Sequence, residues 1–382
     1  MGDRPILGIS MGDPFGNGPE ITVKALASAA VYDRCRPLVV GDVSSMDYAL
    51  QVARKVNGIE LAINPVKSVG EAKFVHGAID VLDMGLVPAG KIPNTLDQAE
   101  PRPFEVGACE MGGEASFCYV EKVIQLALAG EVDATVTNAL AKEAINMAGH
   151  HYSGHTEIYA GYTKTDKYTM MLAYKDLRVA HVSTHVSLRE ACDRVTKARV
   201  LECIRIANES CKALGIENPK IGVAGLNPHC GENGMFGREE IEEIQPAIDT
   251  ALAEGINVIG KKPVPPDTVF SKALGGWYDI VVVMYHDQGH IPLKVKGFVY
   301  NKAEGRWDAV AGINVTLGLP RASVDHGTGF GHAGDGHANE LSLVNAMDYA
   351  ITLANHKKRQ ETPAAILSFI SCADKERKQT AL

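Results

Sequence analysis

The sequence predicts an α/β protein built around a mostly parallel β-sheet. Short, continuously apolar runs alternate with longer segments of helical periodicity along most of the chain. Strands that are apolar throughout are typical of sheets covered by helices on both faces, because neither face meets water. The chain has 382 residues and is 46% hydrophobic, which is enough for two domains of ordinary size or one large domain.

The expected elements follow one another as strand and helix, and each is identified by its pattern. Strands are short apolar runs bounded by polar or glycine-containing turns. They are expected at Ile6–Ser10, Pro37–Gly41, Ala134–Thr137, Thr169–Ala173, Arg178–Ser183, Lys220–Ala224, Asn257–Gly260, Asp279–Met284 and Gly312–Thr316. Helices show apolar residues at helical spacing. They are expected at Pro19–Ala29, Val43–Val56, Gly112–Ala129, Leu188–Leu214, Glu239–Glu254 and Leu341–Asn355.

Two segments lie outside this alternation. Met84–Val106 is rich in proline and glycine and is interpreted as a long surface excursion. The segment from His356 onward is charged at both ends with a short apolar middle. It is interpreted as a peripheral appendage, either an added helix or a loose tail.

Composition and charge exclude several classes of protein. The net charge is −8 and the sequence pI is about 5.9, which argues against general binding to nucleic acid or anionic membranes. No run of about 18 apolar residues is present, and the N-terminus lacks the pattern of a signal peptide. The eight cysteines contain no C-x-x-C pair and are interpreted as reduced thiols. We therefore expect a soluble, cytoplasmic protein.

Three histidines follow three predicted strands. His185, His229 and His286 each stand in a polar loop directly after an apolar run. Ligands of open α/β sheets gather at the carboxyl ends of strands, and three imidazoles leave a divalent metal open to substrate and water. A single histidine in such a place is more often a loop residue with an ordinary hydrogen bond, so a shared metal site and three unrelated loop histidines both stay open.

Other polar groups stand near predicted strand ends and could bind an anion. A pocket for phosphate or carboxylate needs Lys, Arg and backbone N–H groups. The candidates are His155, Thr156, Glu157, Asp267, Lys294, Lys296, Asn314, Arg321, Asp325 and His326. Taken singly, each is a weak signal. The early loop "SMGDPFGNGPEI" matches neither glycine-rich phosphate motif, and it is interpreted as a structural loop that lines a cleft.

Together these residues resemble the 4-hydroxythreonine-4-phosphate dehydrogenase family of vitamin B6 biosynthesis and its paralogues. The resemblance runs from about Leu7 to about Asn355. Its motifs are "MGDPFGNGPEI", "SGHTE", "STHVSL", "GLNPHCGENG", "PPDTVF", "YHDQGHIPLK", "NVTLGLPRASVDHGT" and "AGDGHAN".

The resemblance implies an isocitrate/isopropylmalate-dehydrogenase-like fold of two α/β/α domains with a cleft between them. Residues 1–145 plus 300–382 would form the cofactor-side domain, and 146–299 would carry the metal ligands and the dimer interface. It further implies a homodimer with the active site at the subunit interface. The expected reaction is metal- and NAD(P)-dependent oxidation of the secondary alcohol of a 4-phosphorylated hydroxy acid, after which the β-keto acid loses CO2.

The resemblance also assigns roles to residues. The metal, one divalent ion of Zn, Co or Mg per site, would be held by His185, His229 and His286. Substrate would be bound by His155, Thr156, Lys294, Asn314 and Arg321. NAD or NADP would contact Gly327 and Thr328. Lys294 or Asp267 would carry the proton, and the resemblance does not choose between them.

The chain departs from the family pattern around the expected substrate. "GDPFGNGPE" stands where many members have "GDPAGIGPE", "TNALAK" replaces "TGPxxK", and Arg321 directly follows Pro320. Two kinds of substrate therefore stay open: the vitamin B6 intermediate 4-phosphohydroxy-L-threonine, and the sugar-acid phosphates 4-phospho-D-threonate and 4-phospho-D-erythronate. A related dehydrogenase of an unphosphorylated hydroxy acid or diol and a non-catalytic metabolite-binding relative are the alternatives. "SGHTE" favours a phosphorylated substrate.

Overall fold

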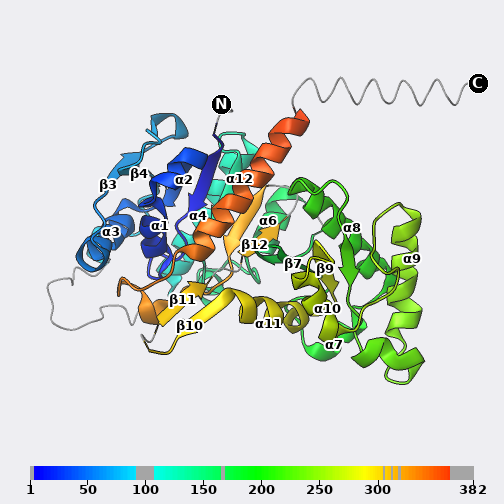
Figure 1. The fold of residues 1–382 in the computed structure, drawn as a ribbon. Helices are drawn as coiled ribbons and strands as arrows, with labels where there is room; N and C mark the ends of the chain where they lie inside the picture. Colours follow the sequence, from blue (N-terminus) through cyan, green and yellow to red (C-terminus); the bar gives the residue numbers. More distant parts are fainter. Residues whose placement is uncertain are drawn as a thin grey trace, which may run out of the picture.

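A single large sheet runs through the molecule (Figure 1). The computed structural model describes residues 4–91, 107–164, 168–303, 306–310, 313–316 and 320–361, with the backbone alone for 90, 306–310, 313–316 and 361. The strands are β1 (Ile6–Ser10), β2 (Arg36–Gly41), β3 (Ala62–Val66), β4 (Ala78–Asp83), β5 (Ala134–Thr137), β6 (Met171–Tyr174), β7 (Leu177–His181), β8 (Ile221–Val223), β9 (Ile280–Val283), β10 (Phe298–Asn301), β11 (Arg306–Val310), β12 (Ile313–Thr316) and β13 (Arg321–Val324).

The helices alternate with these strands. They are α1 (Gly18–Leu26), α2 (Ala29–Arg34), α3 (Val43–Asn57), α4 (Glu110–Leu128), α5 (Lys142–Met147), α6 (His155–Thr163), α7 (Leu188–Asp193), α8 (Lys197–Ala213), α9 (Gln245–Ala253), α10 (Pro266–Leu274), α11 (His286–Gly297) and α12 (Leu341–Glu361). Short helical turns lie at Val69–Glu71, Ala89–Lys91, Pro228–Gly234, Glu240–Ile244 and Phe330–His332. In the described part of the chain, no helix is both long and apolar enough to cross a membrane.

The large sheet has the order β3-β4-β2-β1-β5-β13-β12-β6-β7-β9-β8, and β10 pairs with β11 in a second sheet of two strands. The six strands from β3 to β13 are parallel, and so are β7, β9 and β8. Between these groups β12 and β6 make three antiparallel pairings, which reverse the strand direction. Each parallel group therefore has its own carboxyl edge, and β7, β8 and β9 end at a common one.

Burial explains why the strands are apolar. Every residue of β5 and of β9 is buried, so helices and loops cover both faces there. Helix α4 packs on β1, β2 and β5, whereas α12 packs on β5, β12 and β13. Helices α8, α10 and α11 contact β9 in the same way. The prediction of a mostly parallel α/β sheet is confirmed.

Several predicted boundaries are wrong for local reasons. The expected helix Leu188–Leu214 breaks into α7 and α8, because the Thr196 side chain accepts a hydrogen bond from Arg199 N (3.3 Å) and starts a new helix. The expected strand Asn257–Gly260 reduces to one bridge, between Val258 and Ile221. The expected helix Glu239–Glu254 begins with the π-helical turn Glu240–Ile244. Most of the predicted excursion Met84–Val106 and most of the predicted tail from His356 lie outside the described residues.

Other elements were missing from the prediction. Strands β3, β4, β10, β11 and β13 and helices α2, α5, α6, α10 and α11 have no counterpart there. Helix α11 is the one that matters most for function, because it begins at His286, one of the predicted metal ligands.

Candidate active site

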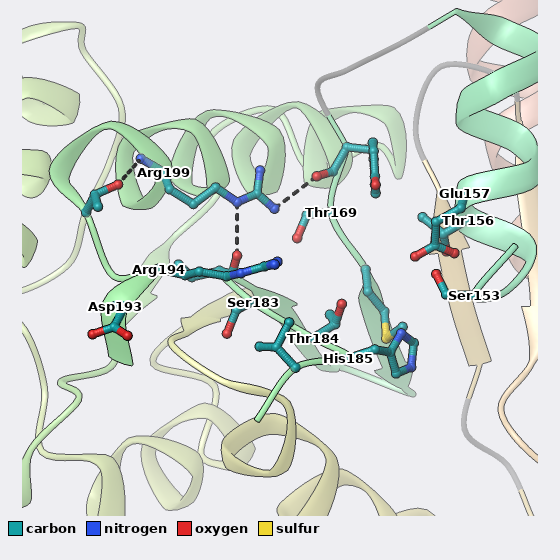
Figure 2. A pocket seen from close by; sticks show the side chains of 15 residues that line it. Ser153, Thr156, Glu157, Thr169, Ser183, Thr184, His185, Asp193, Arg194 and Arg199 are labelled. Atoms are coloured by element: carbon teal, nitrogen blue, oxygen red, sulfur yellow. Dashed lines mark hydrogen bonds between the residues drawn. The ribbon is translucent and has the colours of Figure 1, made fainter. Parts of the chain in front are cut away.

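A cavity of about 690 Å³ opens between the start of α6 and the segment that follows β7. Figure 2 shows polar side chains on both sides of this hollow. Those labelled from α6 and its approach are Ser153, Thr156 and Glu157, and those from the segment after β7 include Ser183, Thr184 and His185. A predicted substrate residue, Thr156, and a predicted metal ligand, His185, therefore line the same cavity.

His185 and His286 lie close together, as their positions after the neighbouring strands β7 and β9 predict. Their ring centroids are 5.6 Å apart, and both side chains line a second hollow of about 480 Å³. The His286 Nδ1 atom is 2.7 Å from Asp287 Oδ1. A carboxylate on Nδ1 fixes the ring and leaves Nε2 for another partner, as in many metal-binding histidines.

Two further histidines surround His286. The His290 ring stacks on the His286 ring with centroids 3.5 Å apart, and its Nδ1 is 2.9 Å from the His286 carbonyl oxygen. His181 is fully buried, its Nδ1 is 3.0 Å from Met170 O, and its ring lies 4.8 Å from His290. Burial lowers the pKa values of both His181 and His290, so both imidazoles are neutral near pH 7. The His181 and His290 rings therefore pack near His286 without placing a positive charge beside it.

His229 is placed differently from this pair. It is exposed, in the turn that follows β8, and its backbone is left-handed with φ of 51°. Among the residues that the structure describes, no three His, Cys, Asp or Glu side chains gather so that they could hold a metal ion. The chain thus brings two of the three predicted ligands together, and His229 is not in one group with them.

Arg321 forms a buried positive centre near α6. It is 1% exposed, its Nη2 donates to Thr137 Oγ1 at 3.3 Å, and its guanidinium lies 5.0 Å from the Tyr159 ring centroid. Burial lowers the pKa of Arg321 to about 10, so it remains a cation at pH 7. A guanidinium held in this way suits an anionic group of a ligand.

His155 and Thr156 start α6 beside this charge. Burial and the nearby Arg321 lower the pKa of His155 well below its usual range, so the ring is neutral. Its Nε2 is buried and has no hydrogen-bond partner among the described residues. Thr156 is 7% exposed. The predicted substrate residues His155, Thr156 and Arg321 are therefore brought together.

Lys294 lies on α11 near the end of β13. Its Nζ is 3.9 Å from Asp325 Oδ2 and 3.5 Å from Asp325 O. Burial raises the pKa of Asp325 to about 6, although the Lys294 charge opposes this shift. Burial and Lys294 lower the pKa of the neighbouring His326. The predicted catalytic lysine therefore has an acidic neighbour, Asp325, which the sequence analysis included only among the candidates for an anion pocket.

The other predicted site residues are more peripheral in this chain. Asp267 is exposed in the first turn of α10. Asn314 pairs with Ser323 and Leu172 in the sheet, in a strand for which the structure gives the backbone alone. Gly327 is exposed, and the carbonyl oxygen of Thr328 accepts a hydrogen bond from Asn17 N at 2.8 Å. The early glycine-containing loop thus packs on the Gly327–Thr328 segment, in keeping with its interpretation as structural.

Two further charged residues belong to the cavity region: Glu157, which the sequence analysis included among the candidates, and Lys142, to which it gave no role. Lys142 and Glu157 both influence the pKa of His185, Lys142 lowering it and Glu157 raising it, while burial is the main cause that lowers it. Glu157 also acts on Arg321. Glu157 was found through the "SGHTE" motif, whereas Lys142 is exposed and stands in "TNALAK", which was noted only as a departure from the family pattern.

Comparison with known proteins decides the family. A family model described as "Pyridoxal phosphate biosynthetic protein PdxA" matches residues 33–350. The chain belongs to the PdxA family. A PdxA-family relative from Cupriavidus necator, named D-threonate 4-phosphate dehydrogenase, is 42% identical over 92% of this chain and 98% of its own length. The prediction of this dehydrogenase family and of an enzyme is confirmed.

Solved PdxA-family structures agree with the fold. A 4-hydroxythreonine-4-phosphate dehydrogenase from Klebsiella pneumoniae is 37% identical, with a TM-score of 0.75 over 92% of this chain and 100% of that one. A protein of the same name from Burkholderia phymatum is 40% identical, with a TM-score of 0.72 over 92% and 99%. The predicted isocitrate/isopropylmalate-dehydrogenase-like α/β fold is confirmed.

Proposed function

We propose that this protein is a metal-dependent, NAD(P)+-dependent dehydrogenase of a 4-phosphorylated hydroxy acid, with D-threonate 4-phosphate as its substrate. The observation that carries the proposal is the buried Arg321 cation beside His155, whose neighbour in the chain, Thr156, lines the same cavity as His185. The relatives named for D-threonate 4-phosphate support the choice of substrate.

The anionic end of the substrate would lie on this Arg321 centre. A neutral His155 and the Thr156 hydroxyl can donate hydrogen bonds to phosphate oxygens, and Arg321 supplies the fixed charge. Asn314 would add a contact from β12. The hydroxyl to be oxidised would then point toward His185 and His286.

The paired histidines fit a divalent ion such as Zn, Co or Mg as two of its ligands. The donor chemistry suits Zn or Co better than Mg, because imidazole nitrogens bind transition metals whereas Mg prefers oxygen ligands, and Asp287 orients the His286 ring. His185 and His286 would hold the metal, which would supply Lewis-acid activation of the substrate hydroxyl, and Gly327 and Thr328 would contact NAD or NADP, which would supply the hydride acceptor.

The proton of the hydroxyl requires a base, and Lys294 is the better candidate of the two predicted. Lys294 would accept this proton as a neutral amine, and its Nζ lies 3.9 Å from Asp325 Oδ2, near the carboxyl edge of β13. Asp267 is exposed on α10 and would serve as the base only if a second subunit covered it in the dimer. Oxidation at the hydroxyl beta to the carboxylate gives a 3-oxo acid, which loses CO2 and leaves a three-carbon ketone phosphate.

A second copy of the chain would complete the site. His229 is exposed on a turn whose neighbours Met235 and Phe236 are 73% and 50% exposed, so that turn offers an apolar contact surface with a ligand at its tip. We propose a homodimer in which His229 of one subunit joins His185 and His286 of the other. Residues 146–299 would form the dimer-side domain, and 1–145 with 300–382 the cofactor-side domain.

A substrate panel tests the proposal. Purified, metal-loaded protein should reduce NAD+ or NADP+ with D-threonate 4-phosphate. It should turn over 4-phosphohydroxy-L-threonine and 4-phospho-D-erythronate more slowly, and D-threonate hardly at all. Equal rates with and without the phosphate would favour the unphosphorylated alternative, and ligand binding without cofactor reduction would favour a non-catalytic relative.

Arg321→Ala should raise KM for the phosphorylated substrate. The loss of one buried charge-assisted contact corresponds to about 2–3 kcal/mol in kcat/KM, or roughly 30- to 150-fold. Steady-state kinetics would measure it, with thermal unfolding to show that the variant is folded. Arg205→Ala is the matched control, because Arg205 is an exposed arginine paired with Glu254. An unchanged KM would remove Arg321 from the phosphate site.

A further inference from the structure

The turn that carries His229 has an unusual backbone. Five consecutive residues, His229 to Asn233, have φ between 43° and 77°, which is the left-handed region. Four of the five are not glycine. Side chains other than glycine rarely adopt this conformation, so a run of it persists only where the surroundings impose it. Something outside the turn must therefore hold it.

The buried carboxylate of Glu240 lies against this turn. Glu240 is 3% exposed, and its Oε1 accepts hydrogen bonds from Leu226 N at 2.8 Å and Asn227 N at 2.7 Å. Its Oε2 accepts from Asn227 Nδ2 at 2.9 Å. A Cβ atom on Gly231 would lie 2.9 Å from the same oxygen, so the chain wraps closely around the carboxylate. Glu240 satisfies the donors at the entrance of the turn.

The base of the turn is also tied to the other half of the site. Gln288, which is 7% exposed, donates from Nε2 to Gly225 O at 2.8 Å. Its Oε1 accepts from Met284 N at 2.6 Å. Because Gln288 is two residues after His286, the segments after β8 and β9 are fixed relative to each other. Only the tip of the turn, with His229, extends outward.

We propose that Glu240 is the positioning residue for His229: it holds the left-handed turn so that His229 is presented, already oriented, to the metal site of the second subunit. The inference rests on the proposed function, which makes His229 a ligand. Glu240 itself touches neither metal nor substrate. It begins a π-helical turn, Glu240–Ile244, and such turns are frequent at functional sites.

Glu240→Gln is the test, because it keeps the shape and replaces one acceptor oxygen by an amide that faces donors. The dimer should bind Zn²⁺ and Co²⁺ about 10- to 100-fold more weakly in competition titrations, the loss typical of residues that support a ligand. The visible absorption of the Co²⁺ form should change, and the Leu226 and Asn227 amides should exchange hydrogen faster. Glu242→Gln is the matched control, since Glu242 lies in the same turn but is exposed and pairs with Arg238.

A double variant separates positioning from general destabilisation. In a His229→Ala background, Glu240→Gln should add no further loss of Co²⁺ affinity, because the ligand that it positions is gone. If Glu240→Gln fails to fold, Asn227→Ala removes one donor to the carboxylate and should give a smaller loss of the same kind. Unchanged affinity in folded Glu240→Gln, or an equal loss in both backgrounds, would overturn the inference while leaving the proposed function intact. Unchanged affinity in His229→Ala alone would overturn the ligand role of His229, and the inference with it.

Discussion

His286→Ala is expected to abolish turnover and to weaken divalent metal binding by at least about 100-fold, the upper value for a residue that only supports a ligand. The reason is geometric. His286 has its ring 5.6 Å from His185 and its Nδ1 held by Asp287, so its loss removes an oriented donor that no neighbour replaces. The free energy of unfolding should change by no more than about 1 kcal/mol, because the hydrogen bond from His290 goes to the backbone of residue 286 and survives.

The matched control is His151→Ala. His151 is an exposed histidine in the approach to α6 that contacts Asn146 at 3.1 Å, and it lines neither of the two hollows next to His185. Its replacement should leave metal affinity and turnover unchanged. Metal affinity would be measured by competition titration and turnover by cofactor reduction, before and after chelation. Full activity of the unmodified enzyme in chelating buffer would show that no metal takes part.

Sequence patterns predicted those strands and helices whose residues suit both their own secondary structure and their place in the folded protein. The run Ile280–Val283 is apolar and fully buried, so its pattern and its place coincide. Helix α11 was missed because Gly289 and Pro292 interrupt the helical pattern. The glycine is required by packing, because a Cβ atom at position 289 would lie 2.6 Å from Nε2 of His181, which is in strand β7. Strand β13 was missed because it starts with a charged residue, Arg321, whose burial depends on α6.

The site could be predicted in part for a similar reason. His185 and His286 follow strands that are neighbours in one parallel group, so the rule of common strand ends brings them together. Asp325 acquires its role only through α11, which brings Lys294 to it from a distant part of the sequence. His229 follows a third strand of the same group, yet its turn leads outward. The sequence of one chain does not tell whether His229 contributes to the site of its own subunit or to that of the second subunit.

Mixed dimers test this last point, and the expected effect is large. His229→Ala and His286→Ala should each be inactive as homodimers. If the two residues act in the same site but come from different subunits, a mixed dimer has one site with both histidines intact and one site with both replaced. Random mixing makes half of the dimers mixed, so activity should return to about a quarter of the unmodified value in the unseparated mixture and to about half in the isolated mixed dimer.

The pairing His185→Ala with His286→Ala is the control for this experiment. Both residues belong to the same cluster in one chain, so every site of a mixed dimer lacks one of them and activity should stay absent. Subunits with different affinity tags would be co-expressed and the mixed species isolated before assay. If both pairings remain inactive although mixed dimers form, all three histidines act within one subunit, and the turn after β8 must then move to bring His229 to the pair. If both regain activity, the His185–His286 pair is itself divided between subunits.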